Sequence, residues 1–314
     1  MDQPFISICI PAYKRIDFLE RLFQSIIGQS FRDYEVVVTD DSPGTEVEEL
    51  SMKYKDRFPA LTYKRNGNAL GTPSNWNEAV LHAKGKWIKI MHDDDWFEGV
   101  DALGVFAKAT TVSNADLFFS AYYDVFLKDG TRKLITPTPM RYRQLRKEPV
   151  TLLSRNIIGP PSVLLYRNDG KHPYDPALKW LVDIDMYVRR LRDDKIHHLP
   201  DAIINVGVGQ YQVTASVHGN PSVEIPEHFY FLGKTGMKPV RNILVYDYWW
   251  RFFRNFNLKN KEAIRKYGQQ IEVHDVFFSM MNWQKMIPRF LLKFGPFSKA
   301  VMWIHFISNR HRIK

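Results

Sequence analysis

Cysteine is nearly absent from this sequence of 314 residues, which contains only Cys9. A single cysteine forms no internal disulfide, so the chain is not a small disulfide-stapled secreted domain and fits a reducing compartment. Cys9 lies between Ile8 and Ile10 in an apolar, strand-like run. This position favours a packing role over a reactive one.

Long apolar runs are also absent. No stretch of about 18 consecutive apolar residues occurs, which argues against a transmembrane helix. Polar residues interrupt the N-terminus before the apolar core of a secretory signal forms. We therefore expect a cytoplasmic protein.

Two glycine-rich phosphate-binding motifs are missing as well. No G-x-G-x-x-G follows the first expected strand, and no Walker-type Gly-Lys-Ser/Thr occurs. Their absence weighs against dinucleotide-dependent dehydrogenases and against P-loop enzymes.

Positive charge, in contrast, is in excess. Lys and Arg number 44 against 34 Asp and Glu, which gives a net charge of +10. Such an excess indicates a polyanionic partner, which can be nucleic acid, an anionic membrane or a phosphorylated substrate. The hydrophobic fraction of 45% is ordinary for a globular protein.

Strand-like and helix-like segments alternate through the first third of the chain. Apolar runs at residues 5–10, 34–39, 61–64 and 87–91 predict strands, and the segments between them have helical periodicity. Asp17 and Glu20 resemble a capping box at the start of the first helix. This alternation predicts an α/β fold with a mostly parallel sheet flanked by helices.

The expected strand that begins at Trp87 runs directly into Asp93, Asp94 and Asp95. Three adjacent carboxylates repel one another and gain nothing in a core, so a solvated acidic turn is one explanation. The other is a site for a hard divalent cation, Mg²⁺ or Mn²⁺, which carboxylate oxygens suit. Because a buried strand feeds the triplet and Trp96 follows it, the sequence favours the metal site.

Polar clusters follow two further strands: Tyr13-Lys14-Arg15 after the first, and Asp40-Asp41 after the second. The carboxyl ends of parallel strands lie at one edge of a sheet, where ligands bind in open α/β folds. We expect the three clusters to form a cleft that holds a nucleoside diphosphate through a metal ion.

Together these motifs resemble the family 2 glycosyltransferases, which are inverting enzymes with the GT-A fold. The segments that carry the resemblance are Ile10 to Lys14, Val38 to Ser42, Asn68 to Gly71 with Asn75 to Asn77, Gly85 to Ile88, and His92 to Trp96. Each segment alone is a weak indicator, but five in this order and spacing are specific. The resemblance is close over roughly the first third of the chain, with a further patch near residue 180.

The resemblance implies roles for individual positions. Pro11, Tyr13 and Asp41, with Asp40 as neighbour, match the pocket that holds the nucleotide base. The alternative for Asp40 is a solvated carboxylate in a turn. Asn68, Gly71 and Asn75 match the loop and the helix start behind the nucleotide. The alternative is that they form only a turn and a helix cap.

The aspartate triplet matches the Asp-x-Asp motif of the family, which meets the ribose and the metal-bound diphosphate. Asp93 and Asp94 are therefore expected at the nucleotide sugar, and Asp94 and Asp95 at the metal. His92 stands where many relatives have an aspartate. The working pair is thus either Asp93 with Asp95 or Asp94 with Asp95.

Asp183 matches the catalytic base of the family, with Val182 in place of the customary glutamate. Inverting transfer needs one carboxylate to take the proton of the acceptor hydroxyl. The alternative is a carboxylate that stabilises a helix N-terminus, a role that Asp185 can fill. We favour Asp183 over Asp185 as the base. Further along, Gln212 and Thr214 replace an expected arginine and histidine of the family, and His218 or Lys234 could supply the lost diphosphate contact.

The middle of the chain is less regular. Residues 117–126 and 133–135 flank Asp129-Gly130, which predicts a β-hairpin. The basic, proline-interrupted segment 137–149 predicts a loop. We expect a GT-A domain over residues 1–224, with a nucleotide-sugar half at 1–115 and an acceptor half at 116–224.

Residues 225–314 are expected to form a helical region rich in aromatic and basic side chains. Within it, residues 245–254 and 286–307 mix Trp, Phe and Tyr with Lys and Arg. These aromatics either pack on the core or form an interfacial, non-spanning membrane element. The expected location is therefore cytoplasmic, with peripheral contact on the inner face of an anionic membrane.

The expected function is metal-dependent, inverting transfer of a sugar from a nucleotide-diphosphate donor, with a UDP-sugar favoured. The acceptor is a hydroxyl of a glycan or of a lipid-linked glycan in envelope polysaccharide synthesis, a step taken from family habit. One alternative is a nucleotidyltransferase that makes a nucleotide sugar, although the loop after the first strand has no glycine. The other is a non-enzymatic nucleic-acid-binding protein, which the carboxylates at the strand ends disfavour, so no nucleic acid is expected.

Overall fold

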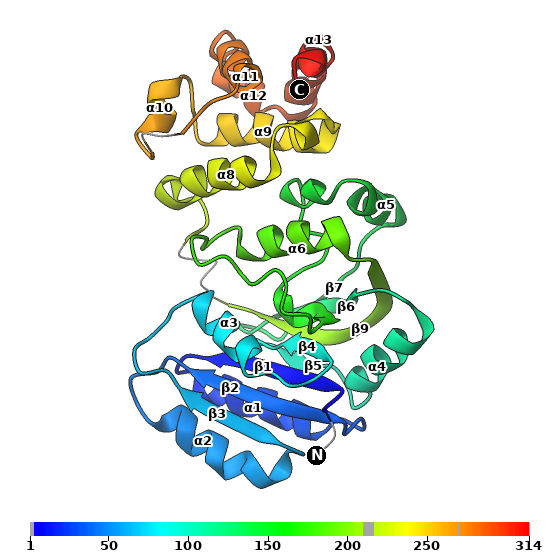
Figure 1. The fold of residues 1–314 in the computed structure, drawn as a ribbon. Coiled ribbons are helices and arrows are strands. Elements are labelled where there is room, and N and C mark those ends of the chain that lie inside the picture. Colours follow the sequence, from blue (N-terminus) through cyan, green and yellow to red (C-terminus); the bar gives the residue numbers. More distant parts are fainter. Residues whose placement is uncertain (1–2, 210–216, 269–270, 314) are drawn as a thin grey trace. The chain divides into compact units, whose positions relative to one another are not determined.

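The structure is a computed structural model that describes residues 3–209, 217–268 and 271–313 (Figure 1). The chain divides into two compact units. Unit 1 comprises Met1–Tyr142 and Ile157–Gln212, and unit 2 comprises Arg143–Asn156 and Val213–Lys314. The functional division expected at residue 224 stays a prediction.

The first half of the sheet in unit 1 is parallel, as the alternation predicted. Its strands are β1 (Ile6–Ala12), β2 (Tyr34–Asp40), β3 (Leu61–Arg65) and β4 (Trp87–Ile90), in the spatial order β3-β2-β1-β4. The connecting helices are α1 (Ile16–Ile27), α2 (Glu46–Tyr54) and α3 (Ser74–Leu81), with the short helix η1 (Lys55–Arg57) after α2. Every residue of β1, β2 and β4 except Pro11 is buried, which explains their nearly continuous apolar sequences.

Helix α1 packs through Leu19, Leu22, Phe23 and Ile26, but its expected capping box is wrong. The N-cap is Arg15, which makes no side-chain cap and has a left-handed backbone with φ of 50°. Glu20 instead accepts hydrogen bonds from Lys53 Nζ and Tyr54 Oη. The carboxylate that the motif assigned to the cap is thus used to tie α1 to α2.

The second half of the sheet is mixed. Continuing from β4, the order is β8 (Leu164–Arg167), β6 (Leu117–Phe126), β9 (Ile196–Val208) and β5 (Trp96–Phe97). Strand β8 is antiparallel to both neighbours, β9 is parallel to β6, and β5 is antiparallel to β9. Strand β7 (Arg132–Ile135) pairs with β6, which confirms the hairpin, and Gly130 has a φ of 72° in its turn. The remaining elements of unit 1 are α4 (Ala102–Val112), η3 (Pro161–Val163) and α6 (Val182–Asp193).

The prediction of a loop over residues 137–149 is wrong. Residues Pro139–Lys147 form helix α5, and Pro149–Leu153 form the short helix η2. Both prolines lie in the first position of their helix, where a missing N–H costs nothing, and Leu145 is the buried anchor of α5. A proline therefore indicates a loop only where it does not stand at the start of a helix.

Unit 2 is helical in its described part, as expected for the C-terminal region. Its longer helices are α8 (Pro221–Thr235), α9 (Ile243–Asn255), α11 (Asp275–Lys285) and α13 (Gly295–Asn309), and the shorter ones are η4 (Lys238–Arg241), α10 (Lys261–Arg265), α12 (Arg289–Lys293) and η5 (Arg310–Arg312). The aromatic run in α9 is buried: Tyr246, Trp249, Trp250 and Phe253 are at most 1% exposed. For residues 245–254 the packing explanation therefore holds. In the described part of the chain, no helix has both the length and the hydropathy of a membrane span.

Candidate functional site

The three polar clusters expected at one sheet edge do lie together, all in unit 1. Strands β1 and β2 are parallel with Ala12 opposite Asp40, and Asp41 N donates to Ala12 O at 3.1 Å. Arg15 Nη1 lies 3.6 Å from Asp93 Oδ1 and 3.3 Å from Asp94 Oδ2. The loop after β1 thus brings a cation directly onto the aspartates that follow β4, and the prediction that the three clusters lie together is confirmed.

Two residues from later in the chain, Ser162 and Gly207, hydrogen-bond to the turn that carries the aspartate triplet. The sequence did not indicate either contact. Asp95 Oδ1 accepts a hydrogen bond from Gly207 N in β9 at 3.0 Å, and the Ser162 hydroxyl also bonds to the Asp95 carboxylate. Ser162 Oγ in turn accepts from His92 N at 3.0 Å. A Cβ added at Gly207 would lie 2.4 Å from the carbonyl oxygen of Asp94, so only glycine allows β9 to approach this closely.

Burial raises the free-energy cost of ionising the carboxylates of this cluster. Desolvation, reinforced by the charge of Asp94, raises the pKa of Asp93 to about 7 and raises the pKa of Asp95 well above its ordinary value. Desolvation also lowers the pKa of His92 to about 4, so the imidazole is neutral at pH 7. A bound cation would remove the cost of ionising the carboxylates together.

The donor atoms present fit a divalent metal ion. One ligand atom each from His92, Asp94 and Asp95 lie within 4.8 Å of one another. Nε2 of His92 is buried and has no hydrogen-bond partner in the described part of the chain. Of the two pairs left open by the sequence, the geometry brings Asp94 and Asp95 together with a nitrogen ligand. The sequence did not suggest His92 as a candidate ligand, because the resemblance implied an aspartate at this position.

The loop that carries Arg15 is strained. Lys14 and Arg15 have φ values of 59° and 50°, a left-handed conformation that side-chain-bearing residues rarely adopt. Lys14 N donates to Ser42 Oγ at 2.7 Å, which ties this turn to the end of β2. Strain of this kind persists where the surroundings fix it and is concentrated at functional sites. Here it directs the Arg15 guanidinium at Asp93 and Asp94.

Asp40 and Asp41 are both buried and already accept hydrogen bonds from the protein. Asp40 accepts from Ser42 N and Tyr63 Oη, each at 2.8 Å. Asp41 accepts from Asn66 Nδ2 at 2.7 Å, Leu70 N at 3.0 Å and Gly71 N at 2.8 Å. The simple explanation of Asp40 as a solvated turn residue is therefore wrong, because its exposure is 0%. Asp41 organises the loop of residues 66–71, and Asn66, which the sequence analysis did not single out, is its partner.

The other residues expected at the nucleotide occupy different environments. Asn75 is buried and donates to Ala12 O and Thr39 O, so it cross-links the ends of β1 and β2. Gly71 has a φ of 71° in the exposed loop that also carries Asn68. Pro11 lies at the end of β1, and Tyr13 is 50% exposed. Lys14 Nζ lies 5.0 Å from the centre of the Tyr13 ring.

Asp183 and Asp185 both lie in the first turn of α6, but their surroundings differ. Asp185 is 1% exposed and pairs with Arg189 Nε at 2.8 Å. In the described part of the chain no cation pairs with Asp183, and desolvation raises the pKa of Asp183 to about 6. Asp183 is thus the carboxylate of the two that is poised to accept a proton near neutral pH. The segment with Gln212 and Thr214 lies outside the described residues.

Comparison with known proteins agrees with this geometry. The sequence pattern of Glycosyl transferase family 2 matches residues 7–167, about half of the chain. The chain belongs to this family. MJ1057 of Methanocaldococcus jannaschii, an uncharacterized glycosyltransferase, is 24% identical over 197 residues, which are 62% of this chain and 67% of the relative. WcaA of Escherichia coli, named for colanic acid biosynthesis, is 25% identical over 225 residues, with 68% and 77% of the two chains covered.

Solved structures show the same fold. TarS of S. aureus, residues 1–349 in complex with UDP-GlcNAc, superposes with a TM-score of 0.67 at 16% identity and covers 98% of this chain and 92% of that chain. The mannosyltransferase PcManGT from Pyrobaculum calidifontis, in complex with GDP-Man and Mn²⁺, gives a TM-score of 0.57 at 14% identity, with 99% and 88% covered. This chain covers 53% of a longer TarS chain. The expected GT-A fold is confirmed, and the protein is a glycosyltransferase of family 2.

Proposed function

We propose that this chain transfers a sugar, with inversion, from a nucleotide-diphosphate donor to a hydroxyl group in a reaction that needs a divalent metal ion. The observation that carries the proposal is the cluster of His92, Asp94 and Asp95, whose ligand atoms lie within 4.8 Å of one another at the carboxyl end of β4. When bound there, the metal ion supplies positive charge against the leaving diphosphate.

The protein's own residues divide the remaining work. Asp183, whose pKa is raised to about 6, takes the proton of the acceptor hydroxyl as its oxygen attacks the anomeric carbon. The bond from that carbon to the diphosphate oxygen breaks on the opposite face, so the configuration inverts and the nucleoside diphosphate leaves. Arg15, which contacts Asp93 and Asp94, lies where it can meet the negative charge of the departing diphosphate.

We assign the nucleotide to the edge formed by Pro11, Tyr13, Asp40 and Asp41. Each carboxylate oxygen has more than one lone pair, so Asp41 can hold the loop of residues 66–71 and still accept an N–H from a base. Asn68, Gly71 and Asn75 place that loop behind the nucleotide, and Asp93 meets the sugar. Solved relatives bind UDP, UDP-GlcNAc or GDP-Man, and a UDP-sugar is the donor that we favour.

The acceptor that we propose is a glycan or lipid-linked glycan of an envelope polysaccharide, handled at the inner face of the cytoplasmic membrane. Two relatives support this class. WcaA is named for colanic acid biosynthesis, and a Campylobacter jejuni protein that is 28% identical over 93 residues is named as a glucosyltransferase acting on an undecaprenol-diphosphate-linked glycan.

A donor screen tests the proposal. The purified chain is incubated with single nucleotide sugars and Mn²⁺ or Mg²⁺, and release of nucleoside diphosphate is measured with and without chelator. We expect one donor to be turned over only with metal, and Asp95→Ala to abolish release without loss of the fold. Equal turnover in excess chelator would contradict metal dependence, and release of pyrophosphate would indicate a nucleotidyltransferase.

A further inference from the structure

Helix α13 in unit 2 buries several polar side chains and exposes several large apolar ones. A surface helix of a soluble protein normally turns its apolar stripe inward and its polar residues to solvent. In α13 the inward residues include Ser298, His305 and Asn309, which are 2%, 0% and 6% exposed. The outward residues include Trp303, Ile304 and Ile307, which are 56%, 52% and 47% exposed.

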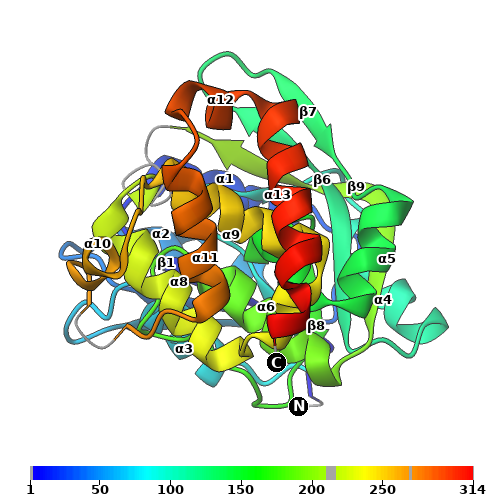
Figure 2. The ribbon, with the colours of Figure 1, turned by 90° about the horizontal axis from the view of Figure 1, so that it is seen from above.

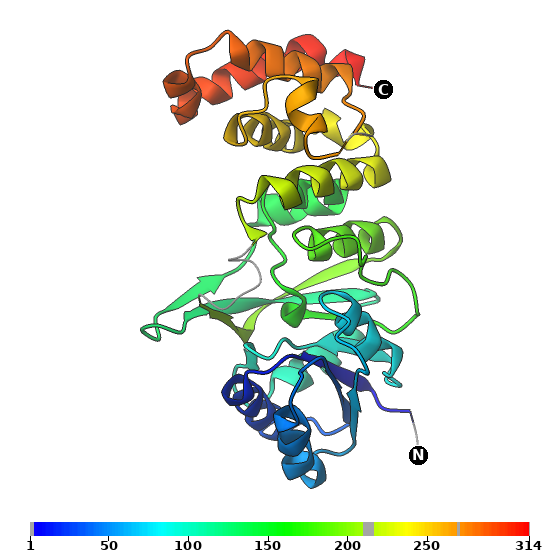
Figure 3. The ribbon, with the colours of Figure 1, turned by 90° about the vertical axis from the view of Figure 1, so that its left-hand side faces the viewer.

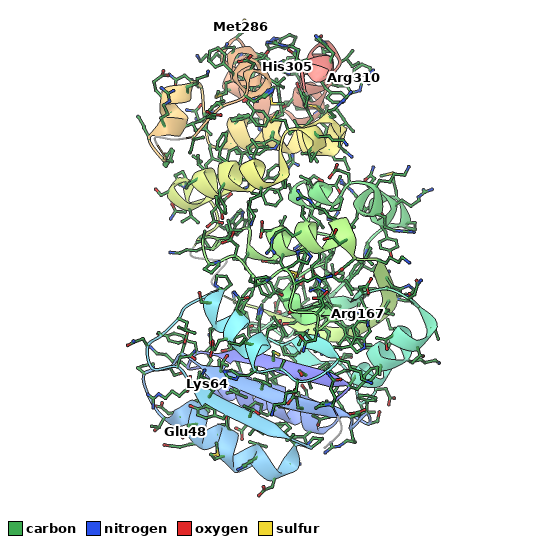
Figure 4. All side chains as sticks on the ribbon, viewed as in Figure 1. Glu48, Lys64, Arg167, Met286, His305 and Arg310 are labelled. Carbon is green, nitrogen blue, oxygen red and sulfur yellow. The ribbon has the colours of Figure 1, made fainter. Side chains whose placement is uncertain are left out.

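The inward polar residues are satisfied within unit 2. His305 bonds to Tyr246 Oη at 2.6 Å and to Ser279 Oγ at 2.9 Å, and Ser298 Oγ accepts from Trp250 Nε1 at 3.1 Å. Figure 2 shows α13 running beside α11, and Figure 4 marks His305 in unit 2. These bonds fix which face of α13 points inward, because rotating the helix would bury apolar groups at the cost of unpaired polar ones.

The exposed apolar face extends beyond α13. Phe290 in α12 and Phe294 at the junction of the two helices are 72% and 61% exposed, and Met286 after α11 is 74% exposed. Met286 is labelled in Figure 4, and Figure 3 shows the same helices from the side. Several large exposed apolar side chains on one short stretch of chain indicate a candidate interaction site. We call Phe290, Phe294, Phe297, Trp303, Ile304 and Ile307 the outer face.

The charged residues on the stretch of chain that carries the outer face have one sign. From residue 276 to residue 314 the sequence has no Asp or Glu and seven Lys or Arg. Arg289, Lys293 and Lys299 are exposed on the same short stretch of chain as the outer face. An apolar face with a basic border is complementary to an anionic lipid surface, where aromatic rings enter the interface and cations meet the headgroups. A second copy of the chain would bring the same positive charges against each other, which disfavours self-association through this face.

We propose that the outer face docks unit 2 on the surface of an anionic lipid bilayer. For residues 286–307 the sequence left two alternatives, packing in the protein or contact with a membrane. Leu292, Met302 and Phe306 pack inside unit 2, whereas the residues of the outer face are exposed. The inference rests on the proposed function in one respect: docking would bring the transferase to the lipid-linked acceptor proposed above. Binding itself follows from unit 2 and is measured without any sugar donor.

The test is co-sedimentation of the full chain with vesicles of phosphatidylcholine, with or without phosphatidylglycerol. We expect binding to the anionic vesicles that weakens with salt, and little binding to the neutral ones. The triple substitution Trp303→Ser, Ile304→Ser, Ile307→Ser should weaken binding at least tenfold. The matched control, Leu81→Ser with Val112→Ser, removes apolar residues that are 74% and 73% exposed in unit 1 and should bind as the unaltered chain does.

A second variant tests the charge. Lys293→Gln with Lys299→Gln should weaken binding about fivefold for each lysine while the thermal midpoint stays unchanged. Donor turnover by the triple variant in solution should equal that of the unaltered chain, which separates a failure of docking from a failure of the proposed chemistry. The proposal is overturned if the full chain ignores anionic vesicles at low salt or if the triple variant binds as well as the control. It is also overturned if the chain is an oligomer that the triple substitution converts to monomers, because a second copy then covers the outer face.

Discussion

Asp183 and Asp185 show how two identical side chains, two residues apart, are given different tasks by their surroundings. Arg189 neutralises Asp185, whereas burial without a cation leaves Asp183 with a pKa of about 6. An ionised group that is desolvated and unpaired lowers the stability of the fold, and such groups are kept where chemistry requires them. The pair therefore allows function and stability to be separated by single substitutions.

Asp183→Asn should lower turnover at least about a hundredfold while it leaves the thermal midpoint unchanged or raises it. The sign follows from the raised pKa: the protonated form is favoured in the fold, so stability is lost as pH rises through about 6, and asparagine removes this loss. In the unaltered chain, turnover should fall about tenfold per pH unit below pH 6, because the base must be deprotonated. Asp185→Asn is the control and should keep the pH profile but destabilise the fold by about 1–3 kcal/mol, since it removes the charged acceptor of Arg189 Nε. If Asp185→Asn is inactive and Asp183→Asn is active, Asp185 is the base and the assignment is reversed.

His92 should decide which metal ion the site prefers. An imidazole nitrogen suits transition metals better than Mg²⁺, so Mn²⁺ is expected to support higher turnover than Mg²⁺ at equal concentration. His92→Asp gives the candidate site an all-oxygen ligand set and should shift the preference toward Mg²⁺. His92→Ala should weaken Mn²⁺ binding, measured by calorimetry, by at least about tenfold, because even changes behind metal ligands cost 10–100-fold. If His92→Asp leaves the ratio of the two metals unaltered, His92 is not a ligand.

At the scale of elements, strand β9 shapes the site although no sequence motif identifies it. Gly207 N holds Asp95, and the absence of a side chain there lets β9 pass the carbonyl of Asp94. Ser162, in the short helix η3 that precedes β8, bonds to the same turn. The acidic motif after β4 is therefore assembled from segments about 70 and 112 residues further along the chain.

Gly207→Ala should destabilise the fold by about 1–3 kcal/mol and reduce turnover more than tenfold, because its Cβ would displace Asp94 from the metal site. Thermal unfolding and donor turnover measure the two effects. Gly104→Ala in α4 is the matched control: a Cβ there meets nothing within 4 Å, and alanine favours the helix, so stability should be unchanged or slightly higher. Full activity of Gly207→Ala would show that β9 does not constrain the aspartates.

Features that depend on residues near one another in the sequence could be predicted, and features that depend on contacts between distant segments could not. The parallel strands β1 to β4 were predictable because nearly every residue in them is apolar and each is followed by turn residues and a periodic helix. The site residues on the strand ends were predictable for the same reason. Helix α5 was not, because Pro139 and Pro149 occupy the starts of α5 and η2. The roles of Asn66 and Gly207 were not predictable either, because they depend on pairing between distant segments. The left-handed turn at Arg15 was equally hidden, because neither Lys14 nor Arg15 is a residue type that prefers that conformation.

At the scale of the whole molecule, each of the two units holds one of the proposed activities. Every residue assigned to metal, nucleotide or base lies in unit 1, and the outer face lies in unit 2. The two activities should therefore respond to different ligands. Donor nucleotide should act on the stability of unit 1, and anionic lipid should act on unit 2.

Hydrogen exchange measured with and without UDP plus Mn²⁺ checks this division. A ligand at a hundred times its dissociation constant stabilises the state that binds it by about 2.7 kcal/mol. We expect added protection in unit 1, greatest in the loop of residues 66–71 and around residues 92–95, and no change in α13. Anionic vesicles should protect α12 and α13 and leave residues 66–71 unaffected. Because Asp41 already accepts bonds from Leu70 and Gly71, nucleotide binding should slow exchange at those two amides first. Equal protection of both units by UDP and Mn²⁺ would show that the two units do not act separately. Unchanged exchange in the loop of residues 66–71 would contradict the assignment of the nucleotide to this edge of the sheet.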